Sequence, residues 1–286
     1  MKNRQIAALF LCGIMSLSLL AGCASNTADA DNSQNDNTQT TEDGIKALYL
    51  SEQGIFSAGG ITVTSDGTFD PENQWEETGA GQTAHVDHAN VLYQIPAEET
   101  GLPMVFLHGY GQSRMGWMTT PDGREGWATY FLRNGHSAYL VDQPGRGEAG
   151  AQASMSTDGF LDTWSEDSKE YKPGDQAWYT HFRIGRVAPE RYEGSQFPEG
   201  DEAQDQFFRQ MTPNTGNFDQ AKAAAALGEV MAQVKERTGN KSIFVTHSQG
   251  GAVGWDVPVE NIAAIVAIEP GGTPQVGSEQ YNRLLE

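Results

Sequence analysis

The stretch Ser242-Ile243-Phe244-Val245-Thr246-His247-Ser248-Gln249-Gly250-Gly251 decides the fold, because it places a serine directly after the pattern of a buried strand. A continuous β-branched and aromatic run is typical of a strand covered on both faces. The sharp turn that follows would force Ser248 into a strained backbone and expose its Oγ, and it needs small neighbours such as Gly250. Thr246 stands where glycine is usual, two residues before the serine. The pattern predicts a nucleophile elbow at Ser248.

Short apolar runs alternate with helical patterns on both sides of this elbow. The predicted strands are Ile61–Thr64, His85–Ile95, Pro103–Leu107, Ala138–Val141 and Ile262–Ile268, and the predicted helices are Trp127–Arg133 and Phe218–Arg237. Strands that alternate with helices favour a parallel sheet with helices on both faces. We therefore expect an α/β fold with a mostly parallel sheet.

Residues from about 147 to 217 interrupt this alternation with many aromatic residues among acids and glycines. A structureless loop of that length is uncommon in a compact domain. One interpretation is a packed excursion on the surface. The other, which we favour, is an inserted cap that covers the active site and gives the substrate an aromatic wall.

Two carboxylates follow predicted strands and are candidates for the acid that orients a catalytic base. Glu269 comes directly after Ile262–Ile268, at the sheet edge where such folds place their sites. Asp142 begins the stretch Asp142-Gln143-Pro144-Gly145-Arg146-Gly147, which is typical of a loop-shaping segment. We expect Glu269 to be the acid, the alternative being a solvent-facing carboxylate at a strand end.

The whole pattern from about residue 50 to 272 resembles the α/β-hydrolase superfamily, and more narrowly a bacterial esterase branch whose triad acid is a glutamate after strand six. The residues that carry the resemblance are His108-Gly109, Asp142–Gly147, His247–Trp255 and Ala267–Gly271. It implies Ser248 as nucleophile, Glu269 as acid and the backbone N–H groups of Tyr110 and Gln249 as oxyanion hole, with no cofactor. Some members of that branch carry paired cysteines in the oxyanion loop, where this chain has Tyr110 and Gly111.

The catalytic histidine is the departure from this pattern. In this fold it follows the serine and the acid in the chain. The six histidines are His85, His88, His108, His136, His181 and His247, and none follows Ser248. We therefore expect the domain, residues 45–286, to be incomplete at its C-terminus, with the last strands missing and this chain inactive. Of the six, His181, in the expected cap, is the candidate that could replace the missing catalytic base.

The N-terminus has the pattern of a lipoprotein signal. Lys2 and Arg4 precede the uncharged run Ile6–Leu20, whose 15 residues are fewer than the roughly 20 of a membrane-spanning helix. Leu20-Ala21-Gly22-Cys23 resembles a bacterial lipobox, although an ordinary signal with an incidental cysteine stays an alternative. We expect residues 1–22 to be a signal peptide, Cys23 the lipid anchor and residues 23–44 a flexible acidic tether.

The composition restricts the partners. A net charge of −20 disfavours binding to nucleic acid. His85-Val86-Asp87-His88 alone does not predict a metal site, because His85 and Asp87 would lie on one face of a strand and His88 on the other.

We expect a small-molecule ester as substrate and attachment to the extracytoplasmic face of the cell membrane. A non-catalytic binding lipoprotein is the alternative; acyl transfer or peptide cleavage by the same residues, and the oligomeric state, stay open.

Overall fold

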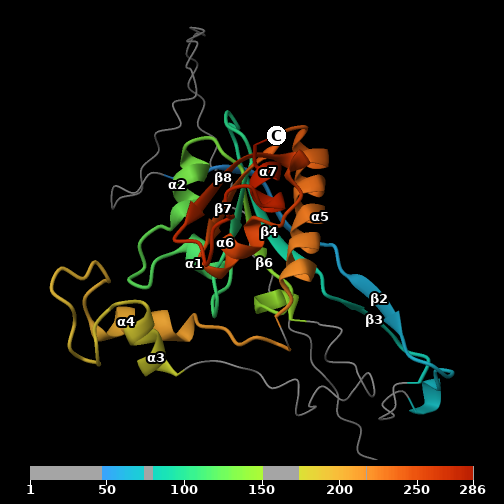
Figure 1. The fold of residues 1–286 in the computed structure, drawn as a ribbon, viewed down its shortest axis with the longest axis horizontal. Coiled ribbons are helices and arrows are strands. Elements are labelled where there is room, and N and C mark those ends of the chain that lie inside the picture. The colour runs from blue at the N-terminus through green and yellow to red at the C-terminus, as the bar shows by residue number, and fades with distance from the viewer. Residues whose placement is uncertain (1–46, 74–79, 151–173, 217, 286) are drawn as a thin grey trace, which may run out of the picture. The chain divides into compact units, whose positions relative to one another are not determined.

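Six strands hydrogen-bond into one sheet in the order β1-β4-β6-β5-β7-β8, in a computed structural model that describes residues 47–73, 80–150, 174–216 and 218–285 (Figure 1). The strands are β1 Leu50–Ala58, β4 Ala89–Pro96, β5 Met104–Leu107, β6 Ala138–Asp142, β7 Ser242–His247 and β8 Ile262–Ile268. The pairs β6–β5, β5–β7 and β7–β8 are parallel, while β1–β4 and β4–β6 are antiparallel. This confirms the predicted α/β class with a mostly parallel sheet.

Both faces of the sheet are covered by helices (Figure 1). Val105 and Leu107 of β5 point to the face on which α5, Gln220–Thr238, packs. Met104 and Phe106 point to the opposite face, with Trp117 of α1, Met115–Met118, and α2, Trp127–Arg133. Successive side chains of a strand alternate between faces, so an unbroken apolar run such as β5 requires two covers.

Helix α5 closely matches the helix predicted over Phe218–Arg237. It begins after Asp219, whose Oδ1 accepts the backbone N–H of Lys222 at 3.1 Å, and a side-chain acceptor at this position stabilises a helix start. It ends at Gly239, where φ is +73°. Glycine adopts that left-handed conformation without the penalty of a Cβ atom.

The prediction of one strand over His85–Ile95 is wrong. The segment contains β3, Thr83–Val86, which pairs with β2, Ile61–Thr64, in a separate two-stranded ribbon, and β4, which starts at Ala89. Asp87 interrupts the run with φ +59°, a conformation that Asp tolerates better than most residues. Lys222 Nζ donates to its Oδ2 at 3.0 Å and holds the kink against α5.

Residues 174–216, within the segment expected to be a cap, have a small hydrophobic cluster of their own. It contains α3, Asp175–His181, and α4, Asp201–Arg209, and its buried members are Trp178, Tyr179, Ile184, Phe207 and Met211. The backbone N–H groups of Thr212 and Thr215 donate to Gly111 O and Gly145 O at 2.8 and 3.1 Å. These bonds tie the segment to the loops at the carboxyl ends of β5 and β6.

The remaining elements are short. They are helices α6 Gln249–Gly254 and α7 Glu279–Arg283 and the 3₁₀ turns Pro71–Asn73, Gly147–Ala149 and Val259–Asn261. The expected signal peptide and the tether up to residue 44 lie outside the described residues, as does Cys23. Within the described ranges, every helix is too short or too polar to cross a bilayer.

Candidate active site

Ser248 lies at the turn between β7 and α6 with φ +50° and ψ −116°. Its N–H donates to Ile268 O at 3.1 Å, and its carbonyl accepts from Gly251 N and Gly271 N at 2.9 and 2.6 Å. A non-glycine residue in such a conformation costs on the order of 1–3 kcal/mol and persists only where its surroundings fix it. The backbone at the predicted elbow is therefore strained and held from both sides.

The loop after β5 packs directly against this turn. A Cβ atom on Gly109 would lie 3.0 Å from Ser248 Cβ, and one on Gly250 would lie 2.4 Å from His108 O. Strands β5 and β7 are parallel neighbours, so their carboxyl ends meet at one edge of the sheet. The close approach explains why glycines stand on both sides of the contact.

Glu269 follows β8 and is joined to Ser248 through its chain neighbours, since Ile268 and Gly271 bond the Ser248 backbone. It is exposed, its φ is +41°, and its Oε2 accepts from Arg183 Nη2 of the 174–216 segment at 3.1 Å. Of the described residues other than glycine, four have positive φ: Asp87, Arg183, Ser248 and Glu269. Three of these four, Arg183, Ser248 and Glu269, therefore lie together at the candidate site.

Arg146 joins the two residues expected to supply the oxyanion hole. Its Nη2 donates to Gln249 Oε1 at 3.3 Å, and Gln143 Nε2 donates to the same oxygen at 3.3 Å. The Arg146 guanidinium also lies over the ring of Tyr110, 5.3 Å from its centroid. The loops that carry Tyr110 and Gln249 are thus brought together, although the role of their N–H groups stays a prediction.

Asp142 is buried, and its carboxylate bonds to the backbone of the loops after β5 and β6. Its Oδ1 accepts from Arg114 N at 2.8 Å, its Oδ2 accepts from Glu148 N at 3.2 Å, and Arg114 Nη1 lies 3.4 Å from Oδ2. A carboxylate that accepts from two backbone N–H groups and pairs with a guanidinium fixes the conformation of the backbone around it.

Histidine side chains lie near the turn, but none in the described ranges hydrogen-bonds to Ser248 Oγ. His247 Nδ1 lies 3.2 Å from Gln112 Oε1; burial lowers the pKa of His247, and Glu269 raises it in part. His108 is buried beneath the loop. His181 is exposed and contacts the rings of Trp178 and Phe182.

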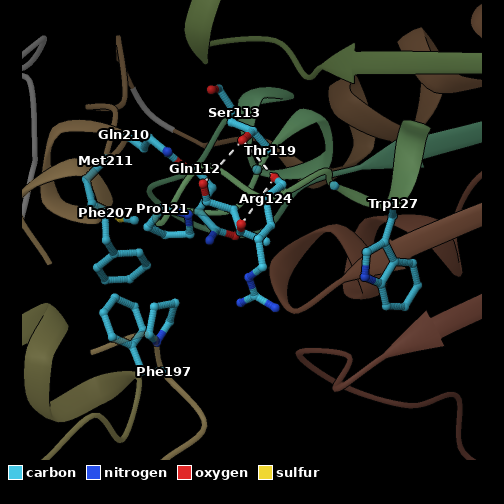
Figure 2. A pocket seen from close by; sticks show the side chains of 14 residues that line it. Gln112, Ser113, Thr119, Pro121, Arg124, Trp127, Phe197, Phe207, Gln210 and Met211 are labelled. Carbon is cyan, nitrogen blue, oxygen red and sulfur yellow. Dashed lines mark hydrogen bonds between the residues drawn. The ribbon is translucent and has the colours of Figure 1, made fainter. Parts of the chain in front are cut away.

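Two cavities of about 240 and 250 Å³ share Gln112, Ser113, Gly116 and Trp127 as walls, and the first of them reaches His247, next to the turn. The first is completed by His108, Trp117, His247 and Ile268. The second extends to the 174–216 segment, and Figure 2 shows Phe197 and Phe207 together on one side of it and Trp127 on the other. Each is slightly smaller than the roughly 300–1,000 Å³ of small-molecule sites, and the two together fall within that range.

Three polar side chains that line the second cavity, those of Thr119, Thr120 and Arg124, already have hydrogen-bond partners. Thr119 Oγ1 donates to Arg124 O at 3.0 Å, Thr120 Oγ1 donates to Asp122 Oδ1 at 2.5 Å, and Arg124 Nε donates to Asp122 Oδ2 at 2.8 Å. The surface left for a ligand is mainly aromatic and aliphatic. The described part of the chain contains no group of three or more His, Cys, Asp or Glu side chains placed to hold a metal ion.

The sequence did not single out Gln112, Arg146 or Arg183. Arg146 lay within the loop motif that begins at Asp142, but its contact with Gln249 spans 103 residues and has no local signal. The same is true of Arg183, whose partner Glu269 is 86 residues away.

A solved structure with a similar fold is that of a bacterial esterase. It is 32% identical to this chain and superposes on it with a TM-score of 0.67. The match covers 83% of this chain and 72% of the esterase chain. The chain therefore belongs to the α/β-hydrolase superfamily.

A curated relative is a probable secreted lipase from a fungus, Fungal sp. (strain ATCC 74256). It is 29% identical over 181 residues, which are 60% of this chain and 46% of the lipase, so this chain spans about half the length of that relative. No protein-family model matches the chain.

Proposed function

We propose that the protein is a serine carboxylic-ester hydrolase with Ser248 as nucleophile. The observation that carries the proposal is the strained turn at Ser248, fixed by Ile268 and Gly271 and packed against the Gly109 loop. Strain of this kind at a serine between a strand and a helix fits the geometry that exposes Oγ for attack. The likeness to a bacterial esterase and a probable lipase supports the same chemistry.

In this mechanism Ser248 Oγ attacks the ester carbonyl carbon while a base accepts the hydroxyl proton. The carbonyl oxygen takes up the π electrons and becomes an oxyanion, which the N–H groups of Tyr110 and Gln249 stabilise. The C–O bond to the alcohol then breaks, and the proton passes from the base to the leaving oxygen. Water hydrolyses the acyl-serine in a second, equivalent step. Glu269 would orient the base.

The cavities favour esters with a neutral, apolar group. Trp127, Phe197 and Phe207 offer ring faces, while the hydroxyls and the guanidinium of the lining already have partners. A short-chain aryl ester such as 4-nitrophenyl butyrate is therefore a suitable probe.

The test is turnover of 4-nitrophenyl butyrate by the protein and by Ser248→Ala, with and without added imidazole. Serine is a weak nucleophile until a base takes its proton, and no described histidine bonds Ser248, so free imidazole is supplied as the base. We expect a rate that depends on Ser248, rises with imidazole and leaves a butyryl group on Ser248 by mass spectrometry. Equal rates in the Ser248→Ala variant would contradict catalysis and favour a binding protein with a hydrolase fold.

We further propose that a lipid on Cys23 attaches the protein to the extracytoplasmic face of the membrane. The support is the sequence Leu20-Ala21-Gly22-Cys23 after an uncharged run. The likeness to a probable secreted lipase agrees with a location outside the cytoplasm. An ester hydrolase held there would meet substrates that arrive from outside the cell.

A further inference from the structure

Arg146 is a buried ionisable side chain that the proposed mechanism does not yet use. It is 1% exposed, and its Nε and Nη1 have no hydrogen-bond partner. None of the described carboxylates forms an ion pair with it. Burial lowers the pKa of Arg146 to about 10, which still leaves it charged at neutral pH. Within the described ranges, the positive charge is thus buried without a counter-charge.

Such an arrangement does not favour folding. A buried charge is ordinarily paired, and exchanging buried ions for apolar residues of similar volume is often neutral or stabilising. The contacts that Arg146 does make are a shared bond to Gln249 Oε1 and a cation–π contact with Tyr110. Both partners are the residues expected to form the oxyanion hole.

We propose that Arg146 is a positioning residue for the oxyanion hole and that its uncompensated charge favours the negative tetrahedral intermediate. The side-chain contacts hold the Tyr110 and Gln249 loops in register, so their N–H groups keep a fixed direction. The charge acts through an interior of low dielectric, where it is screened less than at a surface. Because negative charge develops only after attack, the benefit falls on the transition state. This inference rests on the proposed ester hydrolysis.

The experiment combines kinetics with thermal unfolding of Arg146→Met and Arg146→Lys, using 4-nitrophenyl butyrate and imidazole. We expect Arg146→Met to lower kcat by roughly 10- to 100-fold, below the loss of a whole oxyanion donor, with KM near the wild-type value. Its Tm should be unchanged or higher, because a buried unpaired charge is removed. Arg146→Lys keeps the charge and should retain more of kcat than Arg146→Met.

Arg237→Met is the matched control. Arg237 also lies over aromatic rings, 4.8 Å from the centroid of Phe56 and 4.9 Å from that of Tyr93, but it is exposed near the end of α5. Its removal should leave kcat unchanged. A fall in both kcat and Tm of Arg146→Met would show a structural role and overturn the proposal, as would an unchanged kcat or equal rates for the two Arg146 variants. Absence of Ser248-dependent turnover in the wild type would instead defeat the proposed function itself.

Discussion

His108 is a neutral imidazole held under the oxyanion loop. Its Nδ1 donates to Gly109 O at 2.9 Å, and its Nε2 accepts from Gln143 N at 3.4 Å. Burial lowers the pKa of His108 to about 4, against the pull of Asp142, which raises it. A second proton would occupy the nitrogen that accepts from Gln143, so protonation must break a bond between the β5 and β6 loops.

This arrangement predicts an acid-sensitive fold. The unfolded chain binds a proton at His108 below pH 6.5, whereas the folded chain binds it only near pH 4. The free energy of unfolding is therefore highest above pH 6.5, and it decreases as the pH falls from 6.5 to about 4. The loss should be on the order of 2–3 kcal/mol at about 1.4 kcal/mol per pH unit. Urea unfolding at pH 7 and pH 4.5 measures it. His108→Gln should show a clearly smaller loss, and an equal loss in that variant would assign the sensitivity elsewhere.

At the residue scale the sequence predicts those site residues that follow an apolar strand. Ser248 and Glu269 both end such runs, and the structure brings their backbones together through Ile268 and Gly271. Arg146 and Arg183 could not be predicted, because an arginine in a loop has the same local pattern whether solvent or a distant residue receives its side chain. Only the fold decides that partner.

At the scale of elements, the contact between α6 and the β5 loop can be tested through Gly250. Alanine favours helices over glycine by about 1 kcal/mol, which predicts stabilisation on propensity alone. The added Cβ would lie 2.4 Å from the backbone oxygen of His108, and backbone cannot move aside as a flexible side chain does. We expect this clash to dominate and Gly250→Ala to lower the free energy of unfolding by about 1–3 kcal/mol.

Gly116 of α1 is the matched position, because nothing lies within 4 Å of a Cβ placed there. Gly116→Ala should therefore follow helix propensity and stabilise the protein by up to about 1 kcal/mol. Chemical denaturation of both variants gives the comparison. A stabilised Gly250→Ala would mean that the elbow and the β5 loop are packed less closely than described.

The bounds of elements with a strong local pattern were predicted within a few residues, whereas elements that depend on distant partners were not predicted. Helix α2 and strand β8 have the predicted bounds. Strand β1 was missed because only Ala58 of its nine residues is buried, so its sequence has little apolar alternation. Its position depends on pairing with β4, a contact that no local pattern records. Helices α3 and α4 depend in the same way on their shared aromatic cluster.

At the scale of the whole molecule, the N-terminal sequence predicts where the protein is located. Cells that express the protein and are fed labelled palmitate should incorporate it at Cys23, because the thiol of a lipobox cysteine takes a diacylglycerol, whose acyl chains carry the label. A single chain anchors only marginally, so more than one is expected. Cys23→Ser should abolish the label. Cys12→Ser, the exchange of the other cysteine of the chain, should leave it intact; a label that survives Cys23→Ser would exclude the anchor.

The strained backbone at Ser248 has an evolutionary consequence. Glycine at this position would be free of the steric conflict at φ +50°, and an inert protein that kept the fold only to hold a ligand would gain stability from that exchange. Random substitution under selection for stability alone would therefore tend to erase the serine. The same holds for Glu269 at φ +41°, so both residues occupy positions at which selection for stability alone would favour glycine.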